Sequence, residues 1–230
     1  MKSVMKKTIL AVIFSAFLFG SCVQVDVPRA RQQQGPLSSE RVTITANKAY
    51  LEIGYISLEM FDRDMAVIKQ SGRKHIILKV NSGGGSVVDM WGILDRIKSL
   101  KNKGYQIDSQ STAMIASAAV PIFLMGEHRV LAPHCVVMLH PHSLWTKDIH
   151  DYIYSDKEKA ELDESPTQKS LFEKMSNLWS IEYAEFIADR TDLSYEEALK
   201  YVTTMDTSSG QYWFTAYEAI QMGFADGFLK

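Results

Sequence analysis

The feature that most constrains the fold is a continuous apolar stretch followed by a glycine-rich turn and an amphipathic segment. Residues 74–80 read "KHIILKV", without the regular polar alternation of a half-exposed strand, and "NSGGGS" follows directly. A strand of this kind is typical of a sheet that is covered on both faces. The next segment, 87–104, ends at a glycine and carries apolar residues at helical spacing: Met90, Ile93, Leu94, Ile97 and Leu100. This order predicts βαβ units and a parallel sheet.

The same alternation continues from Arg41 to the end of the chain. Apolar periodicity predicts further helices, and short apolar runs predict further strands. The helices are expected at 57–72, 156–190, 195–202 and in the first part of 214–229, and the strands at 41–46, 105–110, 128–132, 135–140 and the C-terminus. A chain of 230 residues is long enough for one domain with a sizeable core. We therefore expect a single α/β domain over residues 41–230, with a mainly parallel sheet.

The N-terminus has the pattern of an export signal. "MKSVMKK" carries three lysines, and the apolar run "TILAVIFSAFLFG" follows, which is too short to span a bilayer comfortably. Cys22 after Gly20 and Ser21 is similar to a bacterial lipobox, so we predict a lipoprotein-type signal at 1–22 with lipidation at Cys22. A plain secretory signal and an uncleaved anchor are the alternatives. Residues 23–40 have no helical or strand period and are interpreted as a flexible tether.

Composition excludes some partners and supports the predicted location. The formal net charge is −2 and no basic run follows the N-terminal segment, so nucleic-acid binding is not expected. With Cys22 lipidated, only Cys135 would remain, and no intramolecular disulfide would form. We expect a protein anchored by lipid to a membrane of the bacterial cell envelope. A secreted, periplasmic or cytoplasmic location is the alternative.

Two side chains are candidates for catalysis. Ser117 is the one hydroxyl in the small, apolar run "IASAAV", where a merely structural small residue is the simplest interpretation. Pro121 is compatible with a helix that starts near Ser117, which would present the hydroxyl beside the N–H of Ala118. His140 ends the apolar stretch "VVMLH". The sequence His140–Pro141–His142 has no acidic or cysteine partner at ligand spacing, so no metal is expected.

The glycine-rich turn is a third candidate element. Its sequence fits neither of the common nucleotide-binding patterns, so we expect no nucleotide cofactor. Three glycines at a helix start still allow backbone N–H groups to face an anion. An oxyanion hole needs donors of this kind, although a tight strand-to-helix turn is the structural alternative.

Together these motifs resemble the proteolytic subunit of the Clp protease (ClpP), within the ClpP/crotonase superfamily. The family motifs N-S-P-G-G-S, A-A-S-M-G-A and V-M-I-H-Q-P are similar to "NSGGGS", "IASAAV" and "VMLHPH" here, and "WFTAYEAIQMGFAD" matches the C-terminal motif. The resemblance spans residues 41–230. It implies a repeated ββα spiral, Ser117 as nucleophile, His140 as general base, and the amides of Gly85 and Ala118 as the oxyanion hole. It implies no cofactor, and a homo-oligomeric ring.

The acid that completes the family's triad has two candidate positions. Counted back without a gap from the C-terminal motif, the position is Gln211, which carries no charge. A short insertion, "TSSGQ", would instead make Asp206 the acid, and we prefer Asp206. Without an acid, activity would be weak or absent.

The resemblance predicts a membrane-anchored serine endopeptidase that cuts peptides or unfolded segments. An ATP-driven unfoldase would be cytosolic, so an ATPase partner remains an open question for an anchored protein. Two alternatives have to be kept. One is a catalytically impaired ClpP-like scaffold, and the other is a crotonase-type acyl-CoA enzyme, which would use the oxyanion hole without the serine–histidine pair.

Overall fold

The computed structural model describes residues 39–141, 166–204 and 210–230, and the predicted signal, lipidation site and most of the predicted tether lie outside these ranges. The described strands form two sheets. The first has the order β1-β2-β3-β4-β6-β9, and its neighbours are parallel except for the antiparallel pair β1 and β2. Its strands are β1 (Val42–Ile44), β2 (Ala49–Ile53), β3 (His75–Val80), β4 (Gln106–Ser111), β6 (Arg129–Leu131) and β9 (Gly227–Phe228).

The second sheet is smaller and has the order β5-β7-β8. Its strands are β5 (Met114–Ala116), β7 (Val136–Leu139) and β8 (Tyr212–Thr215). β5 and β7 are parallel, and β7 and β8 are antiparallel.

The helices are α2 (Leu58–Ser71), α3 (Val87–Asn102), α4 (Ala119–Leu124), α7 (Pro166–Ala188), α8 (Tyr195–Thr203) and α9 (Ala216–Gln221).

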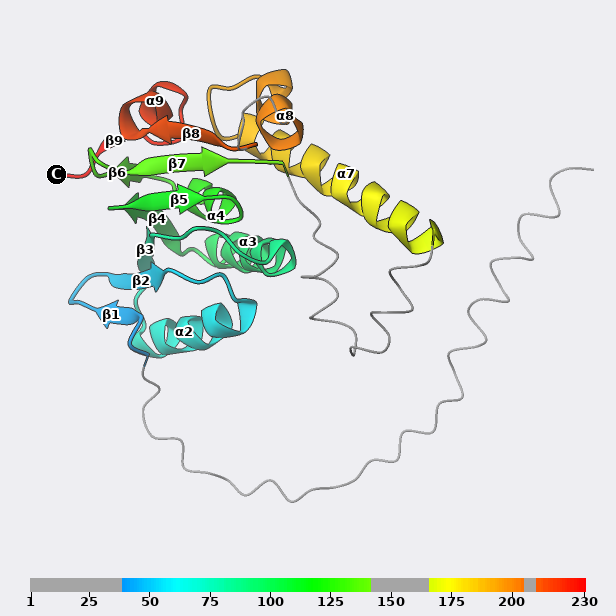
Figure 1. Ribbon diagram of the computed structural model, residues 1–230. Helices are drawn as coiled ribbons and strands as arrows, with labels where there is room; N and C mark the ends of the chain where they lie inside the picture. Colours follow the sequence, from blue (N-terminus) through cyan, green and yellow to red (C-terminus); the bar gives the residue numbers. More distant parts are fainter. Residues whose placement is uncertain (1–38, 142–165, 205–209) are drawn as a thin grey trace, which may run out of the picture. The chain divides into compact units, whose positions relative to one another are not determined.

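The chain winds as a spiral of ββα turns, in which a strand of each sheet is followed by a helix (Figure 1). β4, β5 and α4 form one such turn, and β3, the glycine-rich turn and α3 form the one before it. Isolated bridges extend the second sheet into these earlier turns, because Ser82 pairs with Ile115 and Ile56 pairs with Gly85. The predicted α/β fold, a ClpP/crotonase-like ββα spiral with a mainly parallel sheet, is therefore confirmed.

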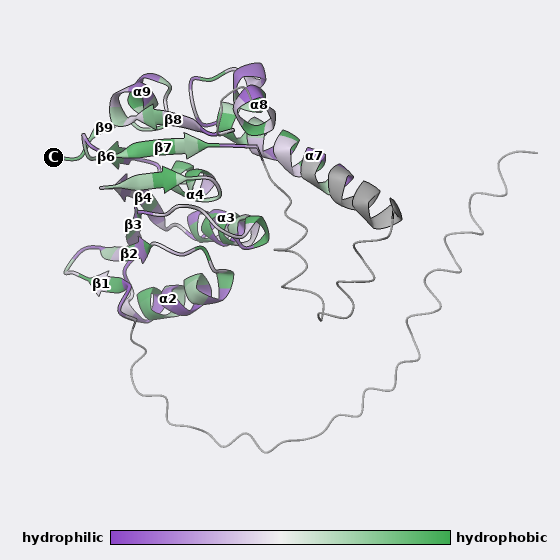
Figure 2. Ribbon diagram, viewed as in Figure 1, coloured by the Kyte–Doolittle hydropathy of each residue, from purple (hydrophilic) through white to green (hydrophobic). Residues whose placement is uncertain are grey.

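α3 illustrates how the sequence produces these turns. The Ser86 side chain accepts a hydrogen bond from the Asp89 N–H, which satisfies one of the unpaired donors of the first helical turn. The predicted apolar stripe is the buried face, with Met90, Ile93, Leu94, Ile97 and Leu100 at most 4% exposed. Each such side chain contributes about 1.5–3 kcal/mol by leaving water. Figure 2 shows the same division on α2, which has hydrophilic and hydrophobic sides, whereas β7 is hydrophobic along its length.

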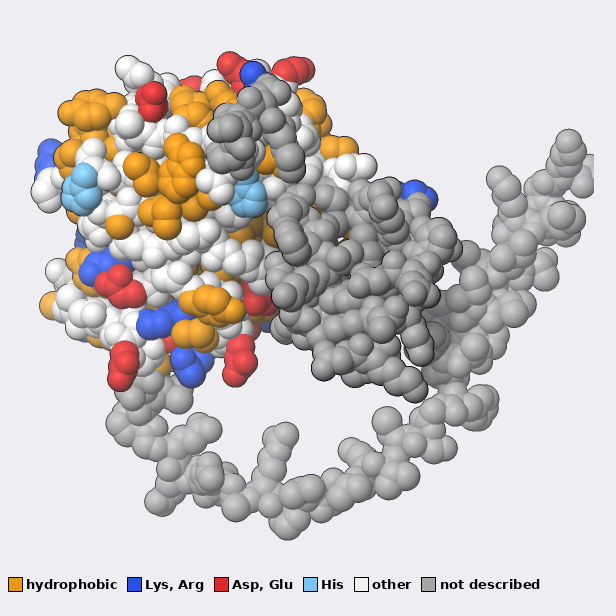
Figure 3. Space-filling view, viewed as in Figure 1, with side chains coloured by type: hydrophobic (Ala, Val, Ile, Leu, Met, Phe, Trp, Pro, Cys, Tyr) orange, Lys and Arg blue, Asp and Glu red, His pale blue; other side chains and the backbone are white. Residues whose placement is uncertain are grey.

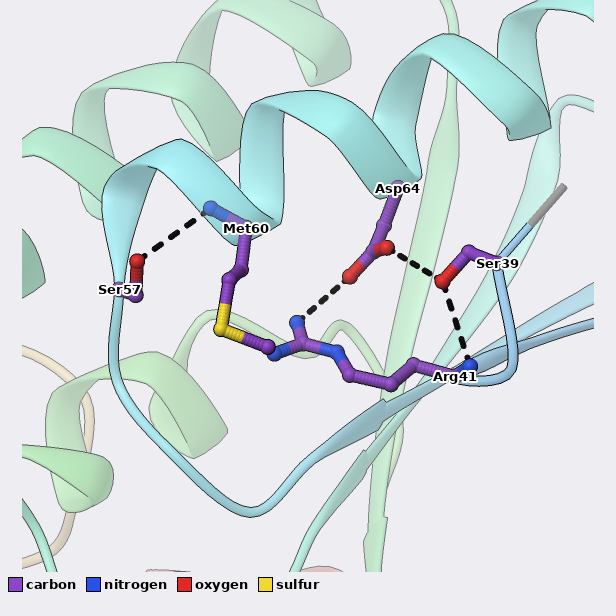
Figure 4. A network of polar contacts seen from close by, with 5 residues as sticks. All are labelled: Ser39, Arg41, Ser57, Met60 and Asp64. Carbon is purple, nitrogen blue, oxygen red and sulfur yellow. Dashed lines mark hydrogen bonds and ion pairs between the residues drawn. The ribbon is translucent and has the colours of Figure 1, made fainter. Parts of the chain in front are cut away.

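The first described residues are fixed to α2 by a buried ion pair (Figure 4). The side chain of Asp64 is 0% exposed and lies 2.6 Å from the Arg41 guanidinium. Ser39 donates a hydrogen bond to the other carboxylate oxygen, and the Arg41 N–H donates to Ser39 Oγ. A second guanidinium nitrogen lies 3.6 Å from the sulfur of Met60. The Asp64 charge is therefore paired, as a charge in a dry core must be.

Three short strands were missing from the sequence-based prediction. β2, with the sequence "AYLEI", has the alternating burial of a half-covered strand, but it is too short for that alternation to stand out in the sequence. β5 has only three residues, and the second half of β8 lies at the start of 214–229, where a helix was expected. The predicted helical region 156–190 is α7 from Pro166 onward, and its first ten residues lie outside the described ranges.

Candidate active site

Ser117 follows β5 directly, and its backbone is in the left-handed region, with φ of 55°. Among the described residues it is the one non-glycine residue with a positive φ. This conformation costs a residue with a side chain about 1–2 kcal/mol, so the surrounding bonds must hold it. The Ser117 N–H donates to the Met138 carbonyl at 2.9 Å, and the Ser117 carbonyl accepts from the Val120 N–H at 2.9 Å. The serine therefore occupies a tight turn between a strand and α4, as the sequence predicts.

His140 lies next to this hydroxyl. Its Nε2 is 2.8 Å from Ser117 Oγ, and its Nδ1 is 2.7 Å from the Pro141 carbonyl oxygen. A carbonyl oxygen only accepts, so the proton of a neutral imidazole in this arrangement is on Nδ1. Nε2 is then free to accept the hydroxyl proton of Ser117. The geometry is that of a nucleophile with its general base.

The parallel strands explain why residues 23 positions apart in the sequence meet. β5 pairs with β7 in the register Ile115 with Val137 and Ala116 with Met138. Both strands therefore end at the same edge of the sheet, and Ser117 and His140 follow these ends. In α/β folds, binding and catalytic sites usually lie outside the carboxyl ends of the parallel strands. The sequence predicted both side chains, and the structure brings them together.

The glycine-rich turn reaches the same edge from the previous ββα turn. A Cβ atom on Gly84 would lie 2.7 Å from the Cβ of Ser117 and 3.0 Å from the Ala116 carbonyl oxygen. Only a residue without a side chain allows this approach, and its φ of 106° favours glycine as well. Gly85 follows with φ of 151° and bridges to Ile56. The sequence singled out Gly85 but not Gly84, whose role depends on contacts across two turns of the spiral.

Asn81 holds the glycine-rich turn to the loop before β5. Its side-chain oxygen accepts hydrogen bonds from the N–H groups of Thr112 and Ala113 at 2.8 and 2.9 Å. The Ser111 hydroxyl donates to the same oxygen at 3.0 Å. These bonds join the end of β3 to the start of β5, the strands that precede the glycine-rich turn and the serine. Asn81 belongs to the "NSGGGS" motif, but its spacing alone did not indicate this function.

Of the two candidate acids, only Gln211 lies among the described residues. Asp206 lies outside the described residues. Gln211 is described, and its side-chain oxygen accepts a hydrogen bond from Trp213 Nε1 at 3.1 Å. β8 pairs with β7 in antiparallel register, with Tyr212 opposite Leu139. Tyr212, the residue after Gln211, therefore pairs with the residue before His140.

A hydrophobic surface lies beside these residues. Figure 3 shows hydrophobic side chains gathered over β7, β8 and α9. Trp213 of β8 and Tyr217 of α9 are large hydrophobic side chains whose exposed fractions are 50% and 63%. Trp213 pairs with Met138 of β7, two residues before His140.

The family comparison agrees with the motifs that meet at this edge. The family whose sequence model matches the chain is described as Clp protease, and the match covers residues 59–230. The chain belongs to the Clp protease family. The match includes the glycine-rich turn, Ser117 and His140, so the resemblance that these motifs predict is confirmed. The comparison with curated proteins found no match.

Two further observations concern this Clp protease domain. Within the described ranges, no three His, Cys, Asp or Glu side chains are grouped so that they could hold a metal ion. None of the helices in the described part of the chain combines the length and the hydropathy that crossing a membrane requires.

Proposed function

We propose that this Clp protease family member is a serine endopeptidase in which Ser117 is the nucleophile and His140 the general base. The observation that carries the proposal is the 2.8 Å distance between Ser117 Oγ and His140 Nε2, at a serine held in a strained turn. A serine hydroxyl is a weak nucleophile unless a base accepts its proton. In the tautomer that donates from Nδ1 to the Pro141 carbonyl, Nε2 carries no proton and faces the Ser117 hydroxyl.

The reaction follows from this arrangement. As Ser117 Oγ attacks the carbonyl carbon of a peptide bond, its proton moves to His140 Nε2, which later protonates the leaving amine. General base catalysis of this kind contributes about 10²–10⁴ in rate. The carbonyl oxygen becomes an oxyanion, and we assign the N–H groups of Gly85 and Ala118 to stabilise it. Each such donor contributes about 10²–10³ in turnover. Water then releases the acyl group by the same route.

The third member of the triad is a separate question. The Pro141 carbonyl orients the imidazole but is uncharged, so it stabilises an imidazolium less than a carboxylate does. We propose Asp206 as the acid, since it precedes β8 in the sequence and the first residue of β8, Tyr212, pairs with Leu139, the residue before His140. If Asp206 is the acid, Asp206→Asn lowers turnover by about 10⁴ while Gln211→Ala has little effect. If Gln211 occupies the position, Asp206→Asn has little effect and Gln211→Asp raises turnover.

The first test is covalent labelling of the full chain with a fluorophosphonate probe, followed by peptide mass spectrometry. We expect the probe on Ser117, and labelling that is lost in Ser117→Ala and in His140→Gln. Ser71→Ala is the matched control, because the Ser71 hydroxyl donates to the Ile68 carbonyl at the end of α2, away from His140. A folded protein that takes up no probe would refute the serine protease assignment. The scaffold alternative would then be favoured.

We further propose that the substrates are exposed peptides or unfolded segments. The exposed side chains of Trp213 on β8 and Tyr217 on α9 support this, because apolar side chains of an extended peptide could pack against them. Clp proteases generally form oligomeric rings, so a homo-oligomer is expected for this chain. Mass photometry of the purified protein distinguishes a ring from a monomer. Hydrolysis of thioester substrates such as acyl-CoA, without hydrolysis of peptides, would instead support the crotonase-type alternative.

The location of this activity rests on the N-terminal sequence alone. We propose that Cys22 is lipidated and anchors the protein to a membrane of the cell envelope. In that case Cys22→Ala moves the protein from the membrane fraction to the soluble fraction of bacterial cells, and the wild-type N-terminal peptide carries the mass of an acyl modification. A wild-type protein whose Cys22 has the mass of free cysteine would contradict the proposal.

A further inference from the structure

A buried tyrosine from α7 contacts the backbone of the candidate nucleophile. Tyr183 is 1% exposed, and its phenol oxygen donates a hydrogen bond of 2.7 Å to the Ser117 carbonyl. The two residues are 66 positions apart in the sequence. Burial raises the pKa of the Tyr183 phenol well above its ordinary value, so the group stays protonated and remains a donor throughout the range in which a serine peptidase works.

The contact falls on the carbonyl of Ser117, the residue with the strained backbone. Ser117 has φ of 55°, and its carbonyl accepts from both the Val120 N–H and the Tyr183 hydroxyl. A carbonyl oxygen has two acceptor positions, so these two donors occupy both. The Val120 bond is local and forms with the first turn of α4. The Tyr183 bond ties the turn to α7, as the bond from the Ser117 N–H to the Met138 carbonyl ties it to β7.

The same peptide unit carries the N–H of Ala118. A peptide bond is planar and trans, so the Ser117 carbonyl and the Ala118 N–H point in opposite directions in one rigid plane. A hydrogen bond that fixes the carbonyl therefore also fixes the direction of the N–H. A donor on the carbonyl oxygen also polarises the amide and makes the N–H a better donor, as happens in hydrogen-bonded chains. The tyrosine thus acts on the peptide that joins the nucleophile to its oxyanion donor.

We propose that Tyr183 is a positioning residue that orients the Ser117–Ala118 peptide, so that the serine hydroxyl faces His140 and the Ala118 N–H faces the oxyanion. This role rests on the proposed function, since it acts through the nucleophile and one oxyanion donor. Tyr183 donates to the carbonyl of Ser117 and not to its hydroxyl. The residue therefore affects the chemical step and not the binding of a ligand.

Saturation kinetics of fluorophosphonate labelling separate these two effects. The test compares the full chain with its Tyr183→Phe variant, which keeps the buried ring and removes only the hydroxyl. We expect the maximal labelling rate to fall about tenfold, the equivalent of one lost hydrogen bond, while the probe concentration at half-maximal rate stays unchanged. A maximal rate within twofold of the wild type would overturn the proposal. A wild type that is not labelled at all would instead refute the proposed function, and with it a catalytic role for Tyr183.

Thr191→Val is the matched control for stability. The Thr191 hydroxyl donates to the Ile187 carbonyl at 2.8 Å, so this variant also removes a hydroxyl-to-carbonyl bond near the end of α7. We expect both variants to lower the denaturation midpoint, and only Tyr183→Phe to slow labelling. Equal slowing in both variants would show that the effect is a general loss of stability, which would also overturn the proposal.

A carbonyl resonance reports the contact without any activity. The chain contains two Ser–Ala pairs, Ser15–Ala16 and Ser117–Ala118. Labelling serine with carbonyl ¹³C and alanine with ¹⁵N therefore gives a Ser117–Ala118 peak in a carbonyl–amide correlation spectrum. A second peak, which Ser15→Thr identifies, is present only where the predicted signal is retained. We expect Tyr183→Phe to shift the Ser117 carbonyl upfield and to move the attached amide, because the carbonyl loses a donor. An unchanged peak would show that the tyrosine does not act on this peptide.

Discussion

The most direct test of the site geometry is a single methyl group added to the glycine-rich turn. In Gly84→Ala, the new Cβ would lie 2.7 Å from Ser117 Cβ, 3.0 Å from the Ala116 carbonyl oxygen and 3.2 Å from Ser117 Oγ. Two of these atoms belong to the serine and one to the backbone, so no side-chain rotation relieves all three contacts. The turn or the serine has to move.

The cost has two parts. The φ of 106° at Gly84 is strained for alanine, which costs about 1–3 kcal/mol. Forcing a methyl group into a packed region costs about 1–3 kcal/mol more. We therefore expect the free energy of unfolding to fall by about 2–6 kcal/mol, the sum of the two parts. Displacing Ser117 Oγ from His140 by an amount on the order of 1 Å lowers the labelling rate about a hundredfold.

Gly104→Ala separates strain from crowding. Gly104 also has a positive φ, of 78°, but nothing lies within 4 Å of its added Cβ. This variant should lose only about 1–2 kcal/mol of unfolding free energy and keep the wild-type labelling rate. Urea unfolding and fluorophosphonate labelling of both variants give the comparison. If Gly84→Ala is no less stable than Gly104→Ala and is labelled at the wild-type rate, the glycine-rich turn does not press against the serine.

Three further predictions concern the support of the site and the core. Asn81→Ala should lower the unfolding free energy by about 1–2 kcal/mol, because backbone donors of the next loop lose their acceptor, while Asn81→Asp should retain most of it in urea unfolding. Arg41→Met leaves the buried Asp64 charge without its cation and should cost about 3–5 kcal/mol, with the double variant Arg41→Met/Asp64→Leu recovering much of the loss by the same measurement. Burial raises the pKa of the Cys135 thiol, so at a mildly alkaline pH the folded protein has less thiolate there than the unfolded chain. Alkylation of Cys135 by iodoacetamide should therefore be slow until denaturant is added, and equal rates before and after denaturation would contradict this.

The long helices and the buried strands could be predicted from the sequence because each carries its own periodicity. α3 has a full apolar stripe with a serine cap, and β3 is a continuous apolar run between turn residues. β5 has no comparable pattern. Its three residues form a strand because β7 lies beside them and because Ser82 bridges to Ile115. A strand that depends on neighbours from two other turns of the spiral leaves little trace in its own sequence.

The residues of the candidate site also fall into those that could be predicted from the sequence and those that could not. Ser117 and His140 could be predicted because each stands out within its own motif, a hydroxyl among alanines and a histidine at a strand end. Gly84 could not be distinguished from the glycines beside it, because its importance is a distance to Ser117 across the sheet. Tyr183 lies in a helix with several aromatic residues, where a buried ring is the ordinary interpretation. Its hydroxyl becomes informative only when its partner is known.

The second sheet holds Ser117 and His140 in a way that does not depend on which residue is the acid of the triad. Ser117 and His140 follow the ends of β5 and β7, whose parallel register sets their separation. The proposed acid, Asp206, precedes β8 in the sequence, and β8 pairs with β7 in the opposite direction. An insertion in the segment before β8 changes which residue precedes β8 without moving the register that holds the serine–histidine pair. We therefore expect the position of the proposed base to be independent of the identity of the acid, so that the two can be tested separately.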